Sequence, residues 1–140
     1  MANEPVVHVI DDDEGVRDSL TFLLDCSGIA TRSYESAVQF LKVAPSMEPG
    51  CIITDVRMPE MGGMELIEKL KGLGVTDPVI VITGHADVPM AIQALHAGVS
   101  DFIEKPFSHE AILIAVRTAL AHQQGRNEIE VERDDIQKRL

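Results

Sequence analysis

The sequence predicts an α/β domain in which a parallel β-sheet is covered by helices on both faces. Short runs rich in valine and isoleucine alternate with segments of helical spacing five times along the chain. Three of these runs, residues 6–10, 51–54 and 79–83, are apolar without alternation, as expected of strands buried on both faces. Strand–helix repeats of this length favour parallel pairing of the strands.

The five expected strands differ in how strongly the sequence marks them. The runs "VVHVI" (6–10), "CIIT" (51–54) and "VIVIT" (79–83) are clear, whereas "IATRS" (29–33) and "VSDFI" (99–103) are weaker. For five such repeats we expect a flavodoxin-like doubly wound sheet with the strand order 2-1-3-4-5.

Each expected strand is followed by a segment in which apolar residues recur at helical spacing. The apolar positions are Val16, Leu20, Leu23 and Leu24; Ala37, Val38 and Leu41; Leu66, Ile67 and Leu70; Met90, Ala91, Ala94 and Leu95; and Ile112, Leu113, Val116 and Leu120. Glycines stand at expected helix ends and polar residues at expected helix starts. These are Gly28, Gly72, Gly74 and Gly98 for the ends, and Asp87 and Ser108 for the starts.

Composition limits the class of protein. A chain of 140 residues, 45% of them apolar, can build one globular domain with a core. It has no apolar run near the roughly 20 residues of a membrane helix and no signal-like N-terminus, so we expect a cytoplasmic protein without a membrane partner. Cys26 and Cys51 lack metal or redox spacing and are expected to be reduced core residues. The formal charge of −11 would repel nucleic-acid phosphates, so these residues should not themselves bind DNA.

Three carboxylates follow two strands that should be neighbours in the sheet. Asp11 and Asp12 come after the first strand, and Asp55 ends the third. Open α/β sheets bind ligands beside the point where the strand order reverses, which here lies between these two strands. Repulsion among the carboxylates is relieved if they share a cation, and an oxygen-only site with few carboxylates suits Mg²⁺. The ion would keep Asp55 charged and nucleophilic.

A hydroxyl and an ammonium group are expected at the same edge. Thr83 closes the fourth strand and Lys105 the fifth. Carboxylates, a divalent ion, a hydroxyl and an ammonium match a tetrahedral phosphoryl dianion on Asp55. The implied reaction is in-line attack of Asp55 on a phosphoryl group, which gives an acyl phosphate. Each residue alone has an ordinary structural explanation, and the inference depends on their joint placement.

Four stretches resemble the receiver domain of two-component response regulators. They are "VIDDDE", "IITDVRMPEMGG", "VIVITGHADVPMA" and "DFIEKPF", and the similarity covers about residues 5–122. The longer phrase "TGHADVPMAIQALHAGVSDFIEKPF" is similar to the FixJ-like branch, although some NtrC-like regulators share much of it.

The resemblance implies a role for each residue of the site. Asp55 would accept a phosphoryl group from a sensor histidine kinase. Asp12, the Asp55 carboxylate and the backbone carbonyl of Arg57 would hold Mg²⁺, with Asp11 acting through water. The donors to the phosphoryl oxygens would be the side chains of Thr83 and Lys105 and the backbone N–H groups of Val56, Arg57 and Gly84.

The resemblance also implies a switch. Thr83 would move toward the phosphoryl group, and Phe102 would rotate into the space it leaves. The surface of the fourth helix and the fifth strand would then form a phosphorylation-dependent homodimer. The Lys105–Pro106 bond is a candidate cis peptide. By the same resemblance, Arg57 and His85 would lie beside the phosphoryl group and tune its lifetime, whereas the residues alone indicate two solvated side chains.

The domain organisation expected is a receiver over residues 1–122 and a polar linker over 123–140. The linker, "RNEIEVERDDIQKRL" in its later part, resembles the helix that precedes a DNA-binding output domain in FixJ-like proteins. A transcriptional output domain missing from this chain would supply the contacts to DNA. A stand-alone receiver that acts as a phosphate sink is the alternative with the same fold.

Two other functions remain open at this point. A haloacid-dehalogenase-like phosphotransfer enzyme also uses Mg²⁺, but it needs a second aspartate two residues after the nucleophile, where this chain has Arg57. A flavodoxin-like cofactor binder needs a phosphate-binding loop after the first strand, where this chain has the anionic run "DDDE".

Overall fold

A computed structural model of the chain describes residues 5–58, 60–84 and 87–123. It contains one parallel sheet in the order β2-β1-β3-β4-β5, which confirms the predicted topology. The strands are β1 (Val6–Ile10), β2 (Ala30–Tyr34), β3 (Gly50–Asp55), β4 (Val79–Thr83) and β5 (Asp101–Glu104). Within these residues no helix is both long and apolar enough to cross a membrane.

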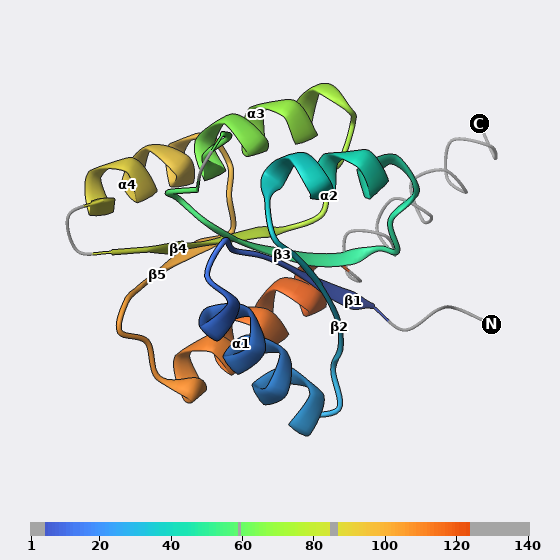
Figure 1. The fold of residues 1–140 in the computed structure, drawn as a ribbon, viewed down its shortest axis with the longest axis vertical. Helices are drawn as coiled ribbons and strands as arrows, with labels where there is room; N and C mark the ends of the chain where they lie inside the picture. Colours follow the sequence, from blue (N-terminus) through green and yellow to red (C-terminus); the bar gives the residue numbers. More distant parts are fainter. Residues whose placement is uncertain (1–4, 59, 85–86, 124–140) are drawn as a thin grey trace, which may run out of the picture.

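Helices cover both faces of the sheet (Figure 1). They are α1 (Glu14–Cys26), α2 (Ala37–Val43), α3 (Gly63–Gly72) and α4 (Val88–His96), with a short 3₁₀ turn η1 (Ala44–Ser46) and a last helix over residues 109–123. In Figure 1, α1 and the last helix lie on one face, and α2, α3 and α4 lie on the other.

Buried apolar side chains fill both layers. On one face Leu20 and Leu24 of α1 pack with Ile112 and Val116 of the last helix over the central strands. On the other face the aromatic ring of Phe40 packs among residues of β1, β3 and α3. A third cluster lies beneath α4 and contains Ala94 and Val99. Burial of this kind contributes roughly 25 cal/mol per Å² of apolar surface, and it fixes the strand ends that carry the polar residues.

Helix boundaries agree with the capping residues in the sequence. Asp13 accepts hydrogen bonds from the backbone N–H groups of Gly15 and Val16 at the start of α1. The Oγ of Ser108 accepts one from the N–H of Ala111 at the start of the last helix. Gly28, Gly74 and Gly98 follow helix ends with φ of 77°, 79° and 108°, a conformation that glycine adopts without a Cβ penalty.

Two sequence predictions need correction. The fifth strand was expected over 99–103 but spans Asp101–Glu104, because the Val99 N–H bonds to the Ala94 carbonyl at the end of α4. Cys26 was expected in the core but is exposed at the last residue of α1, whereas Cys51 is buried. Burial raises the pKa of the Cys51 thiol to about 12. The predicted linker lies outside the described residues from 124 onward, so it stays a prediction.

Candidate functional site

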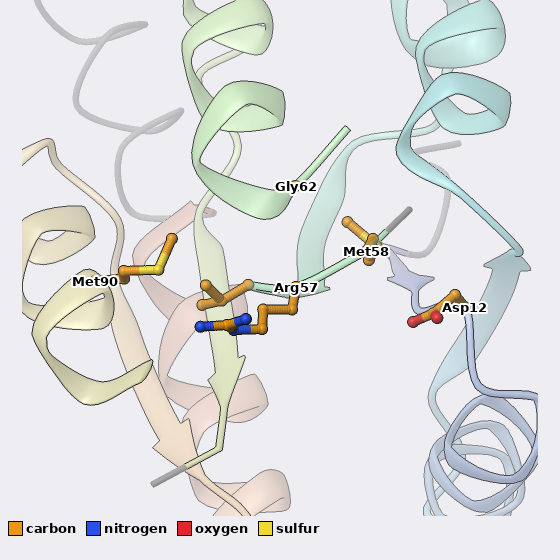
Figure 2. A pocket seen from close by; sticks show the side chains of 6 residues that line it. Asp12, Arg57, Met58, Gly62 and Met90 are labelled. Atoms are coloured by element: carbon orange, nitrogen blue, oxygen red, sulfur yellow. The ribbon is translucent and has the colours of Figure 1, made fainter. Parts of the chain in front are cut away.

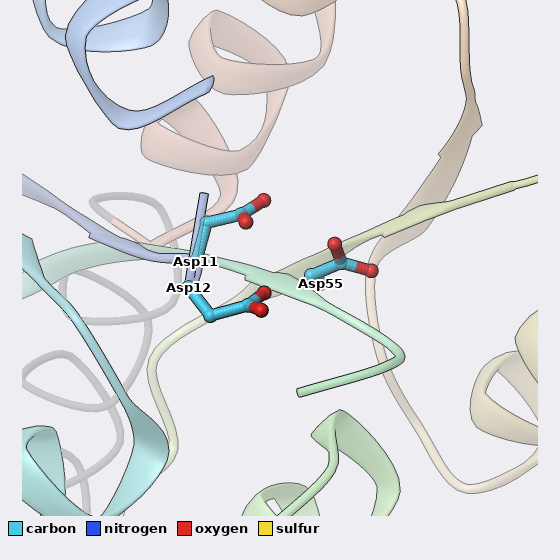
Figure 3. Close-up of side chains that lie close together, drawn as sticks. All are labelled: Asp11, Asp12 and Asp55. Carbon is cyan, nitrogen blue, oxygen red and sulfur yellow. The ribbon is translucent and has the colours of Figure 1, made fainter. Parts of the chain in front are cut away.

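Three carboxylates meet at the carboxyl ends of β1 and β3. One oxygen each from Asp11, Asp12 and Asp55 lies within 4.8 Å of the others. In Figure 3 the three side chains project from the ends of adjacent strands toward a common space. Asp11 is 1% exposed and Asp55 8%, while Asp12 is at the surface. The structure therefore brings together the acidic residues that the topology predicted.

One carboxylate oxygen of Asp11 and one of Asp55 each accept a hydrogen bond from the backbone. The Asp13 N–H donates to Oδ1 of Asp11 at 2.9 Å, and the Arg57 N–H donates to Oδ1 of Asp55 at 3.2 Å. Both donors belong to the loops that leave the strand ends. The bonds fix the orientation of each carboxylate and leave the second oxygen of each for another partner.

Lys105 reaches the cluster from the end of β5. Its Nζ lies 2.9 Å from Oδ2 of Asp55 and 3.9 Å from Oδ2 of Asp11. Burial by itself lowers the pKa of Lys105, but the hydrogen bond and the charge of Asp55, together with Asp11, outweigh it and raise the pKa. The ammonium group is therefore charged and directed at the acid cluster, as the sequence predicted. The Lys105–Pro106 bond that follows is cis, also as predicted.

The second oxygen of Asp11 is buried without a hydrogen-bond partner in the described structure. Burial and the neighbouring charge of Asp55 raise the pKa of Asp11 to about 6, although the hydrogen bond from the Asp13 N–H partly offsets them. Its ion pair with the Nζ of Lys105, at 3.9 Å, is too long for a hydrogen bond. A buried oxygen without a hydrogen bond is costly unless a closer cation or a water satisfies it. An all-oxygen donor set around this atom fits Mg²⁺. The residues present therefore fit the ion that the sequence predicted.

Thr83 and Gly84 lie next to Asp55 on the neighbouring strand. Thr83 is fully buried at the end of β4, and its hydroxyl donates to the Gly84 carbonyl at 3.0 Å. The Lys105 N–H donates to the Thr83 carbonyl at 2.8 Å, which ties the ends of β4 and β5 together. The Val56 N–H donates to the Ile82 carbonyl at 3.1 Å. In this conformation it belongs to the sheet and is not a donor that faces the acid cluster.

Phe102 lies in the third cluster, beneath α4. It pairs with Val81 in the register of β4 and β5 and is half-buried beside Met90, Ala94 and Val99. Phe102 therefore packs against α4. It lies on β5, the neighbour of the strand β4 that ends in Thr83. The family resemblance implied a switch role for both residues, and the sheet register puts them near each other.

The structure adds one contact that the sequence did not predict. Arg57 Nε donates to Oδ1 of Asp87 at 2.6 Å, although thirty positions separate the two residues. The sequence marked Asp87 only as a helix start. The resemblance placed the Arg57 side chain beside the phosphoryl group, and the residues alone indicated a solvated side chain. The Arg57 side chain is indeed 74% exposed, but its partner is 11% exposed. His85, the other position beside the site, lies outside the described residues.

Comparisons with known proteins agree with this geometry. Residues 7–117 match the family model of the response regulator receiver domain. The chain is 47% identical to the transcriptional regulatory protein FixJ of Azorhizobium caulinodans, over 96% of this chain and 64% of the relative. It is 46% identical to FixJ of Rhizobium meliloti, over 96% of this chain and 66% of the relative. The chain thus spans a little under two thirds of the length of these two relatives.

Solved structures give the same result. A crystal structure of FixJ-N superposes with a TM-score of 0.81 at 48% identity, over 86% of this chain and 96% of that one. The response regulator StyR superposes with a TM-score of 0.87 at 35% identity, over 97% of this chain and 69% of that one. With the receiver fold, the acid cluster and these matches together, the chain belongs to the response regulator receiver domain family, and it is FixJ-like.

Proposed function

We propose that this domain accepts a phosphoryl group on Asp55 from a sensor histidine kinase in a Mg²⁺-dependent reaction. One observation carries the proposal. The Nζ of Lys105 and the carboxylates of Asp11 and Asp12 converge on the Asp55 side chain, which is nearly buried at the end of a central strand. A structural salt bridge alone does not require two further carboxylates at the same point, one of them with an unsatisfied buried oxygen.

The metal would be held by the carboxylates of Asp12 and Asp55 and the backbone carbonyl of Arg57, with Asp11 acting through water. Bound Mg²⁺ would neutralise the acid cluster and the phosphoryl oxygens that approach it. The Oδ2 of Asp11 supports this assignment, because it has no hydrogen-bond partner among the described residues and its ion pair with Lys105 is long, at 3.9 Å.

The residues of this chain would then carry out the transfer. An Asp55 oxygen attacks phosphorus while the bond from phosphorus to the imidazole nitrogen of the donor breaks, and that nitrogen keeps the electron pair. The ammonium of Lys105 and the hydroxyl of Thr83 stabilise the charge on the phosphoryl oxygens, with the N–H groups of Arg57 and Gly84. The Thr83 hydroxyl would have to leave the Gly84 carbonyl, to which it now donates.

That movement of Thr83 would start the switch. Phe102 would rotate toward the space that the hydroxyl leaves, and because it packs beneath α4, its rotation would alter the surface formed by α4 and β5. Ile92 and Leu95, three positions apart on α4, are 45% and 37% exposed, so this helix presents large apolar side chains to solvent. We propose that this surface forms the phosphorylation-dependent homodimer.

The output would lie outside this chain. The FixJ relatives are named transcriptional regulatory proteins, and the chain covers 64% to 66% of their length. We propose that residues 123–140 lead to a DNA-binding output domain and that the domain works in the cytoplasm. With Arg57 at the position of the second aspartate of haloacid-dehalogenase-like enzymes, we expect one phosphorylation followed by slow hydrolysis and no catalytic turnover.

Intact-mass measurement tests the proposal. Incubation with acetyl phosphate and Mg²⁺ should add the mass of one phosphoryl group to the wild-type chain. The addition should be absent from the Asp55→Asn variant and from wild type treated with a chelator. An Asp55→Asn variant that gains the same mass would refute the assignment of the acceptor.

A further inference from the structure

The ion pair between Arg57 and Asp87 joins the loop after Asp55 to the start of α4. Arg57 is two residues from Asp55, and its backbone N–H already donates to the Asp55 carboxylate. Its guanidinium, however, donates to Asp87 through Nε at 2.6 Å. Between the described residues, no ion pair links the Arg57 side chain to Asp55. One residue therefore contacts the acceptor with its backbone and α4 with its side chain.

Asp87 occupies the N-cap position of α4 without using its carboxylate there. Among the described residues it makes no capping hydrogen bond, and its ψ of 8° lies outside the extended conformation usual for an N-cap residue. A capping side chain bonds to the N–H of the second or third helical residue. Here the second is Pro89, which has no N–H, so Met90 offers the available donor. The carboxylate of Asp87 thus has two alternative partners, Arg57 and the Met90 N–H.

The surroundings of Arg57 leave room for its side chain to move. A pocket of about 560 Å³ is lined by Asp12, Val56, Arg57, Met58, Gly62 and Met90. Figure 2 shows Arg57 between Met90 on one side and Met58 and Asp12 on the other. The guanidinium can therefore leave Asp87 without disturbing the core.

We propose that Asp87 is a positioning residue that holds the Arg57 guanidinium on α4 in the resting domain, and that a phosphoryl group on Asp55 competes with Asp87 for it. This inference rests on the proposed phosphorylation of Asp55. A phosphoryl dianion attracts a guanidinium more strongly than a single carboxylate does. Once Arg57 has moved, the Asp87 side chain can cap α4. The backbone of Asp87 then changes toward the extended conformation of an N-cap residue, which shifts the first turn of that helix. The exchange links the charge at Asp55 to α4 by a route separate from Thr83 and Phe102.

Beryllofluoride, a phosphoryl mimic, tests the competition in the presence of Mg²⁺. Asp87→Ser removes the carboxylate but keeps a side chain that can cap a helix, so it should lower the beryllofluoride concentration at half-saturation by about three- to fivefold. Asp87→Asn, which is isosteric, should act in the same direction. In an Arg57→Ala background, the Asp87→Ser change should have no further effect. Glu48→Gln, which removes the carboxylate of the exposed Arg32–Glu48 pair elsewhere, is the matched control and should leave the titration unchanged.

The NMR resonance of the Arg57 Nε–H distinguishes this competition from a merely structural ion pair, which would leave the resonance unchanged on beryllofluoride binding. In the resting wild-type chain, the hydrogen bond to Asp87 should protect this proton from exchange, and saturation with beryllofluoride should shift its resonance. If wild type binds beryllofluoride but the resonance stays fixed and Asp87→Ser titrates like wild type, the competition is overturned while the proposed function stands. If wild type shows no Mg²⁺-dependent binding and no phosphorylation, the proposed function fails and this inference falls with it.

Discussion

The Nζ of Lys105 lies 2.9 Å from Oδ2 of Asp55, although fifty residues separate them along the chain. Asp55 ends β3 and Lys105 directly follows β5, with β4 between these two strands. A long side chain is therefore needed to bring the cation to the carboxylate. The same ammonium group lies 3.9 Å from Asp11, so it partly neutralises two of the three acids.

Replacement of Lys105 by methionine tests this relationship. The variant removes the charge but keeps much of the apolar stem, so we expect beryllofluoride binding in the presence of Mg²⁺ to weaken by about tenfold. Because the acid cluster then loses a competing cation, its affinity for Mg²⁺ alone should increase. Titrations of each ligand by NMR measure both effects, with Lys105→Arg as the control that keeps the charge. Equal Mg²⁺ affinity in all three proteins would show that Lys105 does not compete for the cluster.

The raised pKa of Asp11 predicts how stability depends on pH without metal. Between the ordinary pKa of 3.8 and about 6, the folded state keeps a proton that the unfolded chain has lost. The Asp11 site therefore destabilises the fold progressively as pH rises through this window. Asp11→Asn keeps the acceptor for the Asp13 N–H and removes the charge. We expect it to be more stable than wild type by about 2 kcal/mol at pH 7, with the difference vanishing below about pH 4.

Chemical denaturation at several pH values in the presence of a chelator measures this difference. Asp18→Asn, an exposed change in α1, serves as the control and should show no comparable pH-dependent gain. Added Mg²⁺ should stabilise wild type more than Asp11→Asn, because the ion binds the folded cluster. A stability difference that stays constant from pH 4 to 7 would argue against a raised pKa of the buried Asp11 carboxylate.

The exposed apolar residues of α4 predict a surface variant that blocks assembly. Ile92→Lys should leave folding unchanged, since Ile92 is 45% exposed, but should weaken mimic-dependent dimerisation by about tenfold or more. Analytical ultracentrifugation with beryllofluoride and Mg²⁺ measures the change. Ile114→Lys alters an equally apolar residue, 60% exposed, on the last helix at the opposite face of the sheet. If both variants weaken dimerisation equally, the α4 surface is not the interface.

The sequence was sufficient to predict the fold because the strands carry a strong signal. Three of them are continuously apolar, and parallel pairing with short connections leaves few possible orders. The predicted order then places Asp11, Asp12, Asp55, Thr83 and Lys105 at one edge, so the acid cluster could be derived from topology alone. The structure confirms that Asp11, Asp12, Asp55 and Lys105 meet, and it places Thr83 at the end of the neighbouring strand β4.

The contacts that the sequence did not predict depend on side-chain direction. Asp87 matched the pattern of a helix cap, yet its carboxylate turns to Arg57, and no spacing in the sequence indicates that choice. Cys26 fell on a helix with an apolar stripe, but it lies two residues after Leu24, the last residue of that stripe, and it is exposed. The predicted start of β5 was wrong by two residues, because the N–H of Val99 donates to the Ala94 carbonyl at the end of α4.

The most direct test of the central claim locates the phosphoryl group itself. Phosphorylation with acetyl phosphate and Mg²⁺, followed by borohydride reduction, converts an aspartyl phosphate into homoserine, which peptide mass spectrometry can place. We expect homoserine at position 55 in wild type and none when Mg²⁺ is chelated. Homoserine at Asp11 or Asp12 instead, or equal conversion without Mg²⁺, would contradict it.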